Sequence, residues 1–272
     1  MILFPNCKIN LGLHITGKRK DGFHNLETVF YPVPITDALE IISSPQQEKD
    51  IEFNLTGATI DGGDNICIKA YQLLKKDFPH LPPVQMHLHK TIPIGAGLGG
   101  GSADGAFTLL LLNKNYHLQL TQPQLLHYAL QLGSDCPFFI INKPCIAGGR
   151  GEDLVEIGLD LSAYKLVIVN PGIHINTGWA FSQLMPKAPA NSLIEIVKKP
   201  INEWKDFLIN DFEEPIFHHH PSIKKLKEDL YQSGAVYASM SGSGSTVFGL
   251  FPKDQNVSFS FPPAYFIKEC YL

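Results

Sequence analysis

The residues best suited to chemistry lie in a glycine-rich stretch, PIGAGLGGGSADGA, which runs from Pro93 to Ala106. Six glycines precede the apolar run FTLLLL. Glycines just before a helical run are typical of a loop whose main-chain N–H groups bind an anion at the start of the helix. The stretch therefore predicts a cradle for a polyphosphate, with a flexible loop that binds nothing as the alternative.

Two other glycine motifs fit this stretch less well. Gly95, Gly97 and Gly100 match the dinucleotide fingerprint G-x-G-x-x-G, but no Asp or Glu lies between Asp104 and Asp135 to bind a ribose hydroxyl. The Walker P-loop requires a lysine directly after its last glycine, and here Ser102 follows instead. A phosphate cradle without a lysine of its own remains the best interpretation.

Phosphoryl transfer also needs a cation for the developing charge and a carboxylate for the acceptor hydroxyl. Apolar residues alternate from Cys7 to Ile15, which predicts a half-buried strand with Lys8 and Asn10 on its non-core face. Lys8 is then either a functional cation or an ordinary surface lysine. Asp135, in GSDCPFF, is either a functional acid or the N-cap of a helix.

Three further groups are open to more than one interpretation. Ser102 could donate to a phosphate, ligate magnesium or cap the helix after the loop. The turn Ser241–Ser245 is most often only a hairpin. The adjacent histidines His218–His220 point in different directions on a helix and are interpreted as surface residues rather than a metal site.

Composition limits the class of protein. The chain has 272 residues, 44% of them hydrophobic, enough for one or two globular domains. A net charge of −4 argues against nucleic acid as a partner. The five scattered cysteines indicate a reducing compartment and no zinc site. With no run typical of a signal peptide or a membrane span, we expect a soluble cytoplasmic protein, with no protein partner implied.

The elements that position these residues mix strands and helices without strict βαβ alternation, which predicts the α+β class. Strands are expected at residues 7–15, 23–33, 38–42, 51–55, 84–94, 164–172 and 262–272, and as a pair within 236–251. Helices are expected at 64–78 with Asp64 as N-cap, 102–116, 122–132 with Thr121 as cap and Gly133 as stop, near 179–185, and across 201–234 with interruptions at Pro215 and Pro221.

Three segments together resemble the GHMP kinases, and the resemblance covers nearly the whole chain. They are PNCKINLGLHITGKRKDGFHNL from Pro5, the glycine-rich stretch from Pro93, and SMSGSGSTVF from Ser239. The glycine loop alone indicates the superfamily. DGFH, Asp21–His24, resembles the D-G-Y-H element by which one branch of the family holds the cytidine of its substrate. The resemblance implies a small-molecule kinase that uses ATP with Mg²⁺.

The resemblance also implies a two-domain α+β GHMP kinase fold. Residues 1–157 would form the N-terminal ATP-binding domain, of the ribosomal protein S5-like type. Residues 158–272 would form the ferredoxin-like C-terminal domain, because the pattern of elements starts afresh beyond Gly158. In this family the substrate site lies in the cleft between the two domains.

By the same resemblance, Lys8 stabilises the transferring phosphoryl group and Asp135 is the catalytic base. The residues implied at the ATP site are Pro93, Ile94, Gly95, Ala96, Gly97, Leu98, Gly99, Gly100, Gly101, Ser102, Ala103, Asn65, Ile66 and Lys90, with Ser102 a candidate Mg²⁺ contact. The residues implied at the substrate site are Asn10, Phe23, His24, Thr177, Phe181, Gly242, Ser243 and Gly244. His24 would read the cytosine edge while Phe23 and Phe181 stack on the base.

Three residues depart from the family pattern. Phe23 replaces the usual tyrosine, which preserves stacking. Ala103 replaces a serine, which removes a hydroxyl from the loop. Gly105 replaces an alanine, which weakens the helix start by about 1 kcal/mol.

Three other functions remain as alternatives. A GHMP kinase for mevalonate, homoserine or a sugar would share the three segments, although DGFH argues against it. An NAD(P)-binding oxidoreductase would use the G-x-G-x-x-G match. A noncatalytic nucleotide-binding module would use the phosphate cradle alone.

Overall fold

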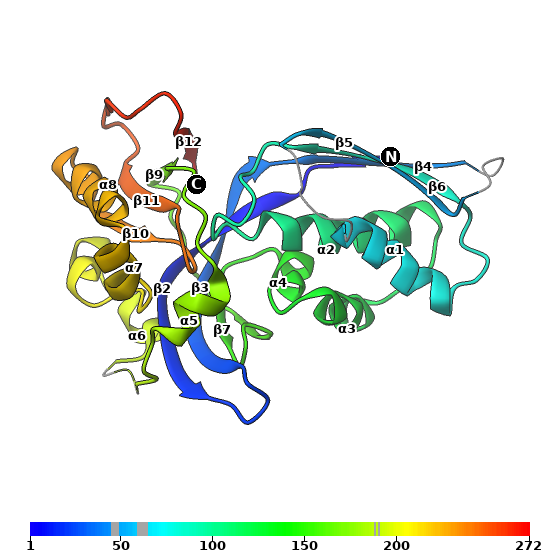
Figure 1. Ribbon diagram of the computed structural model, residues 1–272, viewed down its shortest axis with the longest axis horizontal. Helices are drawn as coiled ribbons and strands as arrows, with labels where there is room; N and C mark the ends of the chain where they lie inside the picture. The colour runs from blue at the N-terminus through cyan, green and yellow to red at the C-terminus, as the bar shows by residue number, and fades with distance from the viewer. Residues whose placement is uncertain (45–48, 59–64, 188, 190) are drawn as a thin grey trace. The chain divides into compact units, whose positions relative to one another are not determined.

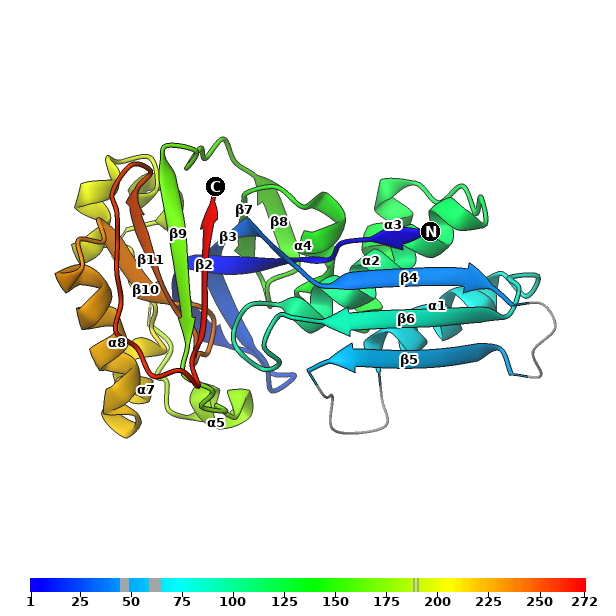
Figure 2. The ribbon, with the colours of Figure 1, turned by 90° about the horizontal axis from the view of Figure 1, so that it is seen from above.

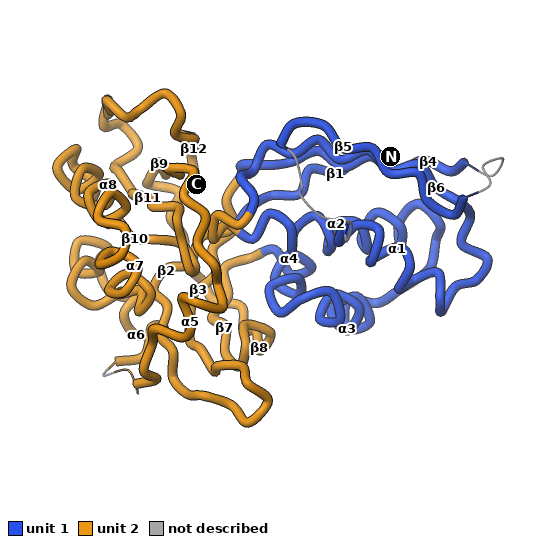
Figure 3. The backbone as a smooth tube through the Cα atoms, viewed as in Figure 1, with its two compact units in different colours: residues 1–7, 35–94, 99–142 blue, residues 8–34, 95–98, 143–272 orange. Residues whose placement is uncertain are grey.

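The computed structural model describes residues 1–44, 49–58, 65–187, 189 and 191–272. The chain forms two compact units, each assembled from separate stretches of sequence (Figure 3). Unit 1 comprises Met1–Cys7, Ile35–Ile94 and Gly99–Asn142; unit 2 comprises Lys8–Pro34, Gly95–Leu98 and Lys143–Leu272. Both units contain helices and strands, so the α+β prediction is confirmed.

Unit 1 is one sheet covered on one face by helices (Figures 1 and 2). The strands, in spatial order, are β1 (Ile2–Leu3), β4 (Ala38–Ser43), β6 (Val84–Lys90) and β5 (Ile51–Gly57). β5 runs parallel to β6, and the other pairs are antiparallel. The helices are α1 (Ile66–Asp77), α2 (Gly100–Asn115), α3 (Gln122–Leu132) and α4 (Cys136–Ile141).

The helix ends in unit 1 follow from local capping. Asn65 caps α1, because its side-chain oxygen accepts a hydrogen bond from Cys67 N–H at 2.8 Å. Asp64, the cap expected from the sequence, lies outside the described residues. Thr121 and Gly133 flank α3 as predicted.

Unit 2 holds two four-stranded sheets. The first has the order β2 (Asn6–Lys18), β3 (His24–Thr36), β7 (Cys145–Gly148) and β8 (Asp153–Glu156). The second has the order β10 (Tyr237–Met240), β11 (Val247–Pro252), β9 (Tyr164–Asn170) and β12 (Phe266–Tyr271). The β7–β8 hairpin is absent from the sequence prediction, because each strand has only four residues.

The helical elements of unit 2 are short except for the last. They are α5 (Thr177–Ser182), α6 (Leu193–Ile196), the 3₁₀ helix η1 (Ile201–Asp206), α7 (Glu213–His219) and α8 (Pro221–Gln232). α8 packs on β10 and β11, and buries Ile223, Leu226 and Leu230 in the core. The prediction of an interruption at Pro215 is wrong: this residue lies in the first turn of α7, where a missing N–H costs no helical hydrogen bond.

β2 departs from the predicted half-buried strand. Its residues from Asn6 to Leu13 are all buried, on both faces, instead of alternating. Lys8 and Asn10 are therefore interior residues, exposed by only 3% and 2%. The alternative of an ordinary surface lysine at position 8 is excluded.

A buried ion-pair cluster joins the sheet of unit 1 to α2. The ammonium of Lys90, at the end of β6, contacts carboxylate oxygens of Asp37 and, at 2.8 Å, Asp104 in α2. Burial alone would lower the pKa of Lys90, but Asp104 and Asp37 raise it. Among the described residues, Asp104 Oδ1 has no hydrogen-bond partner. Burial raises the pKa of Asp104 to about 7, against the attraction of Lys90.

Replacing Asp104 with Asn should change how stability depends on pH. The folded chain holds the Asp104 proton more tightly than the unfolded chain, so this group contributes stability at low pH that is lost as the pH rises from 3.8 through about 7. Asn does not titrate but keeps an oxygen that can accept from Lys90. We would measure the free energy of unfolding in urea, at pH 5 and at pH 8, for Asp104→Asn and for wild type. The difference between variant and wild type should favour the variant more at pH 8 than at pH 5. Identical pH dependence in both proteins would contradict this assignment.

Candidate active site

The path of the glycine-rich loop depends on glycines with positive φ. Gly95, Gly97 and Gly99 have φ of 65°, 79° and 70°, values that residues with a Cβ rarely adopt. Gly99 is the N-cap of α2, and Ala103 N–H donates the first helical hydrogen bond, to Gly99 O at 2.9 Å. The N–H groups of residues 100–102 thus have no partner within the helix and are the expected phosphate donors.

Within unit 2, residues Gly95–Leu98 are held between β2 and the β10–β11 turn. Lys8 N–H donates to Leu98 O at 2.9 Å, and the Ser241 hydroxyl donates to Gly97 O at 2.8 Å. A Cβ on Gly97 would lie 2.0 Å from Ser241 O, so only glycine fits there. The predicted strand, loop and Gly/Ser turn therefore meet at one place in this unit.

The side chains of Lys8 and Asn10 contact each other, as their shared strand face predicted. Lys8 Nζ donates to Asn10 Oδ1 at 2.5 Å, and Asn10 Nδ2 donates to Thr28 Oγ1 at 3.0 Å. The Lys8 ammonium also lies 4.8 Å from the ring centroid of Phe30. Sequence reasoning missed Thr28, which β3 places opposite Asn10. These contacts fix a buried cation beside the glycine loop.

The turn Ser241–Ser245 is more than a hairpin connection. Asn210 Nδ2 donates to Met240 O and Gly242 O, each at 2.8 Å, and these bonds fix the main chain at the start of the turn. The hydroxyls of Thr177 and Ser243, both predicted at the substrate site, lie 3.3 Å apart. Asn210 lies far from the turn in sequence and carries no local signal, so sequence reasoning missed it.

Two of the three residues predicted to hold a base contact each other in unit 2. The rings of His24 and Phe181 stack, with centroids 5.0 Å apart and planes at 16°. Phe23 is 50% exposed at the β2–β3 turn. That turn is fixed by Asp21, which accepts from Phe23 N–H at 3.1 Å and from the Arg19 guanidinium at 3.0 Å. Although desolvation acts to raise it, these contacts hold the pKa of Asp21 below its ordinary value.

In unit 1, Asp135 occupies the N-cap position of α4, but its side chain makes no capping hydrogen bond. The next residue, Cys136, begins α4, which packs on α2. Burial raises the pKa of Cys136 to about 12, although the Ser102 side chain acts to lower it, so it stays a neutral thiol. Asp135 and the candidate phosphate helix are thereby neighbours within this unit.

The residues predicted beside the nucleotide contribute to packing in unit 1. The Asn65 side chain caps α1, and the Lys90 ammonium contacts two carboxylates. Gly105 has a packing reason: a Cβ there would lie 2.8 Å from Ile66 Cγ1. The small loss of helix propensity at Gly105 thus accompanies a close approach of α1 to α2. Contact of these residues with ATP stays a prediction.

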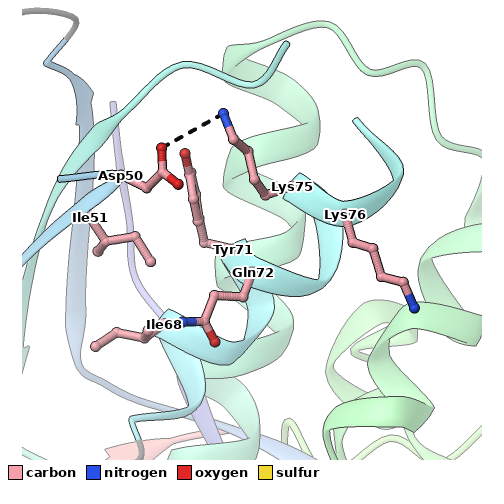
Figure 4. Close-up of a pocket in the computed structure, with 7 residues that line it drawn as sticks. All are labelled: Asp50, Ile51, Ile68, Tyr71, Gln72, Lys75 and Lys76. Carbon is pink, nitrogen blue, oxygen red and sulfur yellow. Dashed lines mark ion pairs between the residues drawn. The ribbon is translucent and has the colours of Figure 1, made fainter. Parts of the chain in front are cut away.

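A separate pocket of about 490 Å³ opens beside α1 in unit 1 (Figure 4). The Lys75 ammonium lies 3.8 Å from Asp50 Oδ1 across it. Its described lining contains none of the predicted site residues; it consists of Asp50, Ile51, Ile68, Tyr71, Gln72, Lys75 and Lys76. We therefore do not assign it to the candidate active site.

Three further properties bear on the class of protein. No helix within the described residues is long and apolar enough to cross a membrane. All five cysteines are free thiols. Among the described residues, no three His, Cys, Asp or Glu side chains are grouped so as to hold a metal ion.

Comparisons with known proteins place both parts of the chain in one family. Residues 65–143 match the family model of the GHMP kinases N terminal domain, and residues 192–259 match that of the GHMP kinases C terminal domain. These matches fall on opposite sides of the domain boundary expected at residues 157 and 158, whose exact place stays a prediction.

Relatives with high identity cover nearly the whole chain. A 4-diphosphocytidyl-2-C-methyl-D-erythritol kinase of Bacteroides thetaiotaomicron is 54% identical over 253 residues, 92% of each chain. One of Parabacteroides distasonis is 46% identical over 274 residues, 100% of this chain and 98% of the relative.

Solved structures agree with this placement. A crystal structure of 4-(cytidine 5'-diphospho)-2C-methyl-D-erythritol kinase superimposes with a TM-score of 0.79 at 30% identity, over 92% of this chain and 90% of that one. The mevalonate kinase of Methanococcus jannaschii, at 14% identity and a TM-score of 0.69 over 93% and 91%, shares the fold. The chain belongs to the GHMP kinases and, within them, to the family of the 4-diphosphocytidyl-2-C-methyl-D-erythritol kinases.

Proposed function

We propose that this chain transfers a phosphoryl group from ATP to the 2-hydroxyl of 4-diphosphocytidyl-2-C-methyl-D-erythritol, a step of the non-mevalonate route to isoprenoids. The observation that carries the proposal is the buried Lys8–Asn10 pair, which is hydrogen-bonded to Thr28 of β3 and lies beside the glycine loop. The helix after this loop begins with N–H groups that have no partner within the helix. The relatives' names supply the substrate.

Unit 2 contributes the cation and the contacts to the acceptor. Lys8 would stabilise charge on the transferring phosphoryl group, where a buried ammonium acts more strongly than one in water. Asn10, whose side chain contacts Lys8 at 2.5 Å, would hydrogen-bond the acceptor end of the substrate. Stacking by Phe23 and Phe181 and edge recognition by His24 suit a flat base such as cytosine.

Unit 1 contributes the base and the phosphate donors. Asp135 would accept the proton of the attacking hydroxyl and orient it. Its carboxylate makes no capping bond to α4, which favours the functional over the capping interpretation. The N–H groups of residues 100–102, at the positive end of α2, would hold the ATP phosphates.

The donor set also fits Mg²⁺. The Ser102 hydroxyl and the Asp135 carboxylate belong to the same unit and are oxygen donors of the kind that Mg²⁺ prefers. Because no three acidic, His or Cys side chains gather among the described residues, the ion would enter with ATP, largely coordinated by the phosphates. When bound, Mg²⁺ supplies charge neutralisation on the phosphoryl oxygens.

The substrate assignment predicts which acceptor drives ADP release. We expect ADP release in a coupled assay to require 4-diphosphocytidyl-2-C-methyl-D-erythritol and not mevalonate, homoserine or galactose, because Phe23 and His24 suit a base that only the first compound carries. Turnover with mevalonate and none with the cytidyl compound would reassign the chain within the GHMP kinases. Binding of NADH but not ATP would instead favour an oxidoreductase.

Replacing Phe23 with Ala should weaken substrate binding selectively. Stacking on one base is worth about 1–3 kcal/mol, so the substrate KM should rise several-fold or more while the ATP KM changes little. Phe23→Tyr, which keeps the ring, is the matched control and should be mild. An equal rise in both constants for Phe23→Ala would indicate a defect in folding rather than in base recognition.

Replacing Asp135 with Asn separates catalysis from helix capping. Both side chains accept the same capping hydrogen bond, so a cap would survive the change. As a general base, Asp135 should instead contribute about 10²–10⁴-fold to kcat, measured by single turnover at saturating ATP and substrate. Lys8→Met should also lower kcat strongly. The loss of transition-state stabilisation in the double variant should be smaller than the sum of the losses in the two single variants. A rate for Asp135→Asn within about threefold of wild type would leave the mechanism without its base.

A further inference from the structure

Arg150 lies in the turn of the β7–β8 hairpin, an element that no sequence motif marked. Gly151 N–H donates to Gly148 O at 2.9 Å and closes the turn. Leu26 N–H, on β3, donates to Gly149 O at 2.8 Å and ties the turn to the strand that follows Phe23. The hairpin therefore holds Arg150 at a fixed place beside the β2–β3 turn of the same unit.

The Arg150 guanidinium covers one face of the Phe23 ring. Its central carbon lies 3.9 Å from the ring centroid, within the range of a strong cation–π contact. Arg150 is partly buried, while half of the Phe23 side chain remains exposed. A guanidinium plane on one face leaves the opposite face of the ring as the one that a flat ligand can cover.

The contact of Arg150 with Phe23 reduces the loss of side-chain freedom that accompanies ligand binding. An exposed aromatic ring at the tip of a turn loses rotamer freedom when a ligand stacks on it, and that loss weakens the complex. Asp21 fixes the backbone of the turn through Phe23 N–H, but this bond does not itself restrain the rotation of the ring about its side-chain bonds. Packing of Arg150 on the ring restricts that rotation before the ligand arrives.

We propose that Arg150 is a positioning residue for base recognition: it holds the Phe23 ring as a preformed platform on which the base of a nucleoside diphosphate stacks. The proposal rests on the proposed function, which makes Phe23 a base contact. Arg150 acts through the ring, so its effect exists only while the ring is present.

A double-mutant cycle tests this dependence. Wild type, Arg150→Met, Phe23→Ala and the double variant are compared by their substrate KM, ATP KM and kcat. Arg150→Met keeps a long apolar side chain and removes the charge, so we expect the substrate KM to rise about 2–5-fold, with kcat and the ATP KM unchanged. Arg150→Lys should recover part of the loss. In the Phe23→Ala background, Arg150→Met should add no further rise.

Lys143→Met is the matched control for the loss of one positive charge near this hairpin. Lys143 is exposed and pairs with Glu156, the last residue of β8, at 2.9 Å. The substrate KM of Lys143→Met should equal that of wild type. This result would support an effect of Arg150 through its contact with the ring rather than through its charge alone. A substrate KM raised as much as in Arg150→Met would overturn the proposal.

Two outcomes of the cycle would also overturn it. If Arg150→Met raises the substrate KM equally with and without the Phe23 ring, Arg150 touches the substrate itself, most simply its diphosphate. If Arg150→Met leaves the substrate KM unchanged, the platform does not need the guanidinium. Failure of the proposed function is distinguishable from both, because wild type would then show no ADP release with the cytidyl substrate.

Discussion

Close main-chain packing at Gly97 is the constraint on which the site in unit 2 depends. The Ser241 carbonyl lies where a side chain on Gly97 would begin, and the Ser241 hydroxyl donates to the Gly97 carbonyl. This contact brings the glycine loop against the β10–β11 turn. On the other side of the loop, Lys8 N–H of β2 donates a hydrogen bond to Leu98 O. Three segments far apart in sequence are thus held by a main-chain bond from Lys8 and a hydroxyl bond from Ser241, with the side chains of Lys8 and Asn10 in the interior.

Lys8 and Lys90 are both buried, and their ammonium groups make different contacts. Lys90 contacts two carboxylates, and this pairing stabilises its charge while it joins β6 to α2. Lys8 contacts a neutral amide oxygen of Asn10 and the ring face of Phe30. The Lys8 ammonium lies on β2 beside the glycine loop, where the proposed function needs a cation for the transferring phosphoryl group.

Sequence alone predicted what depends on local periodicity. The alternation from Cys7 to Ile15 placed Lys8 and Asn10 on one face, and their side chains do contact each other. The same alternation wrongly predicted that Lys8 and Asn10 lie outside the core. The residues that cover them come from the glycine loop and from Ser241, more than 80 and 230 positions away in the sequence. Asn210 and Thr28 were missed for the same reason. Asp135 was left between two interpretations, since a sequence cannot show whether a side chain makes a capping bond.

The departures from the family pattern gain a physical meaning only in three dimensions. Gly105 looked like a weakened helix, yet α1 approaches so closely that a methyl group would overlap Ile66. Phe23 looked like a conservative loss of a hydroxyl, yet its ring lies under a guanidinium from a hairpin that no pattern predicted. The proposed base platform combines a local turn, fixed by Asp21, with a long-range contact from Arg150. On this proposal, recognition of the base involves Arg150, which lies outside the family's motifs, as well as Phe23 within them.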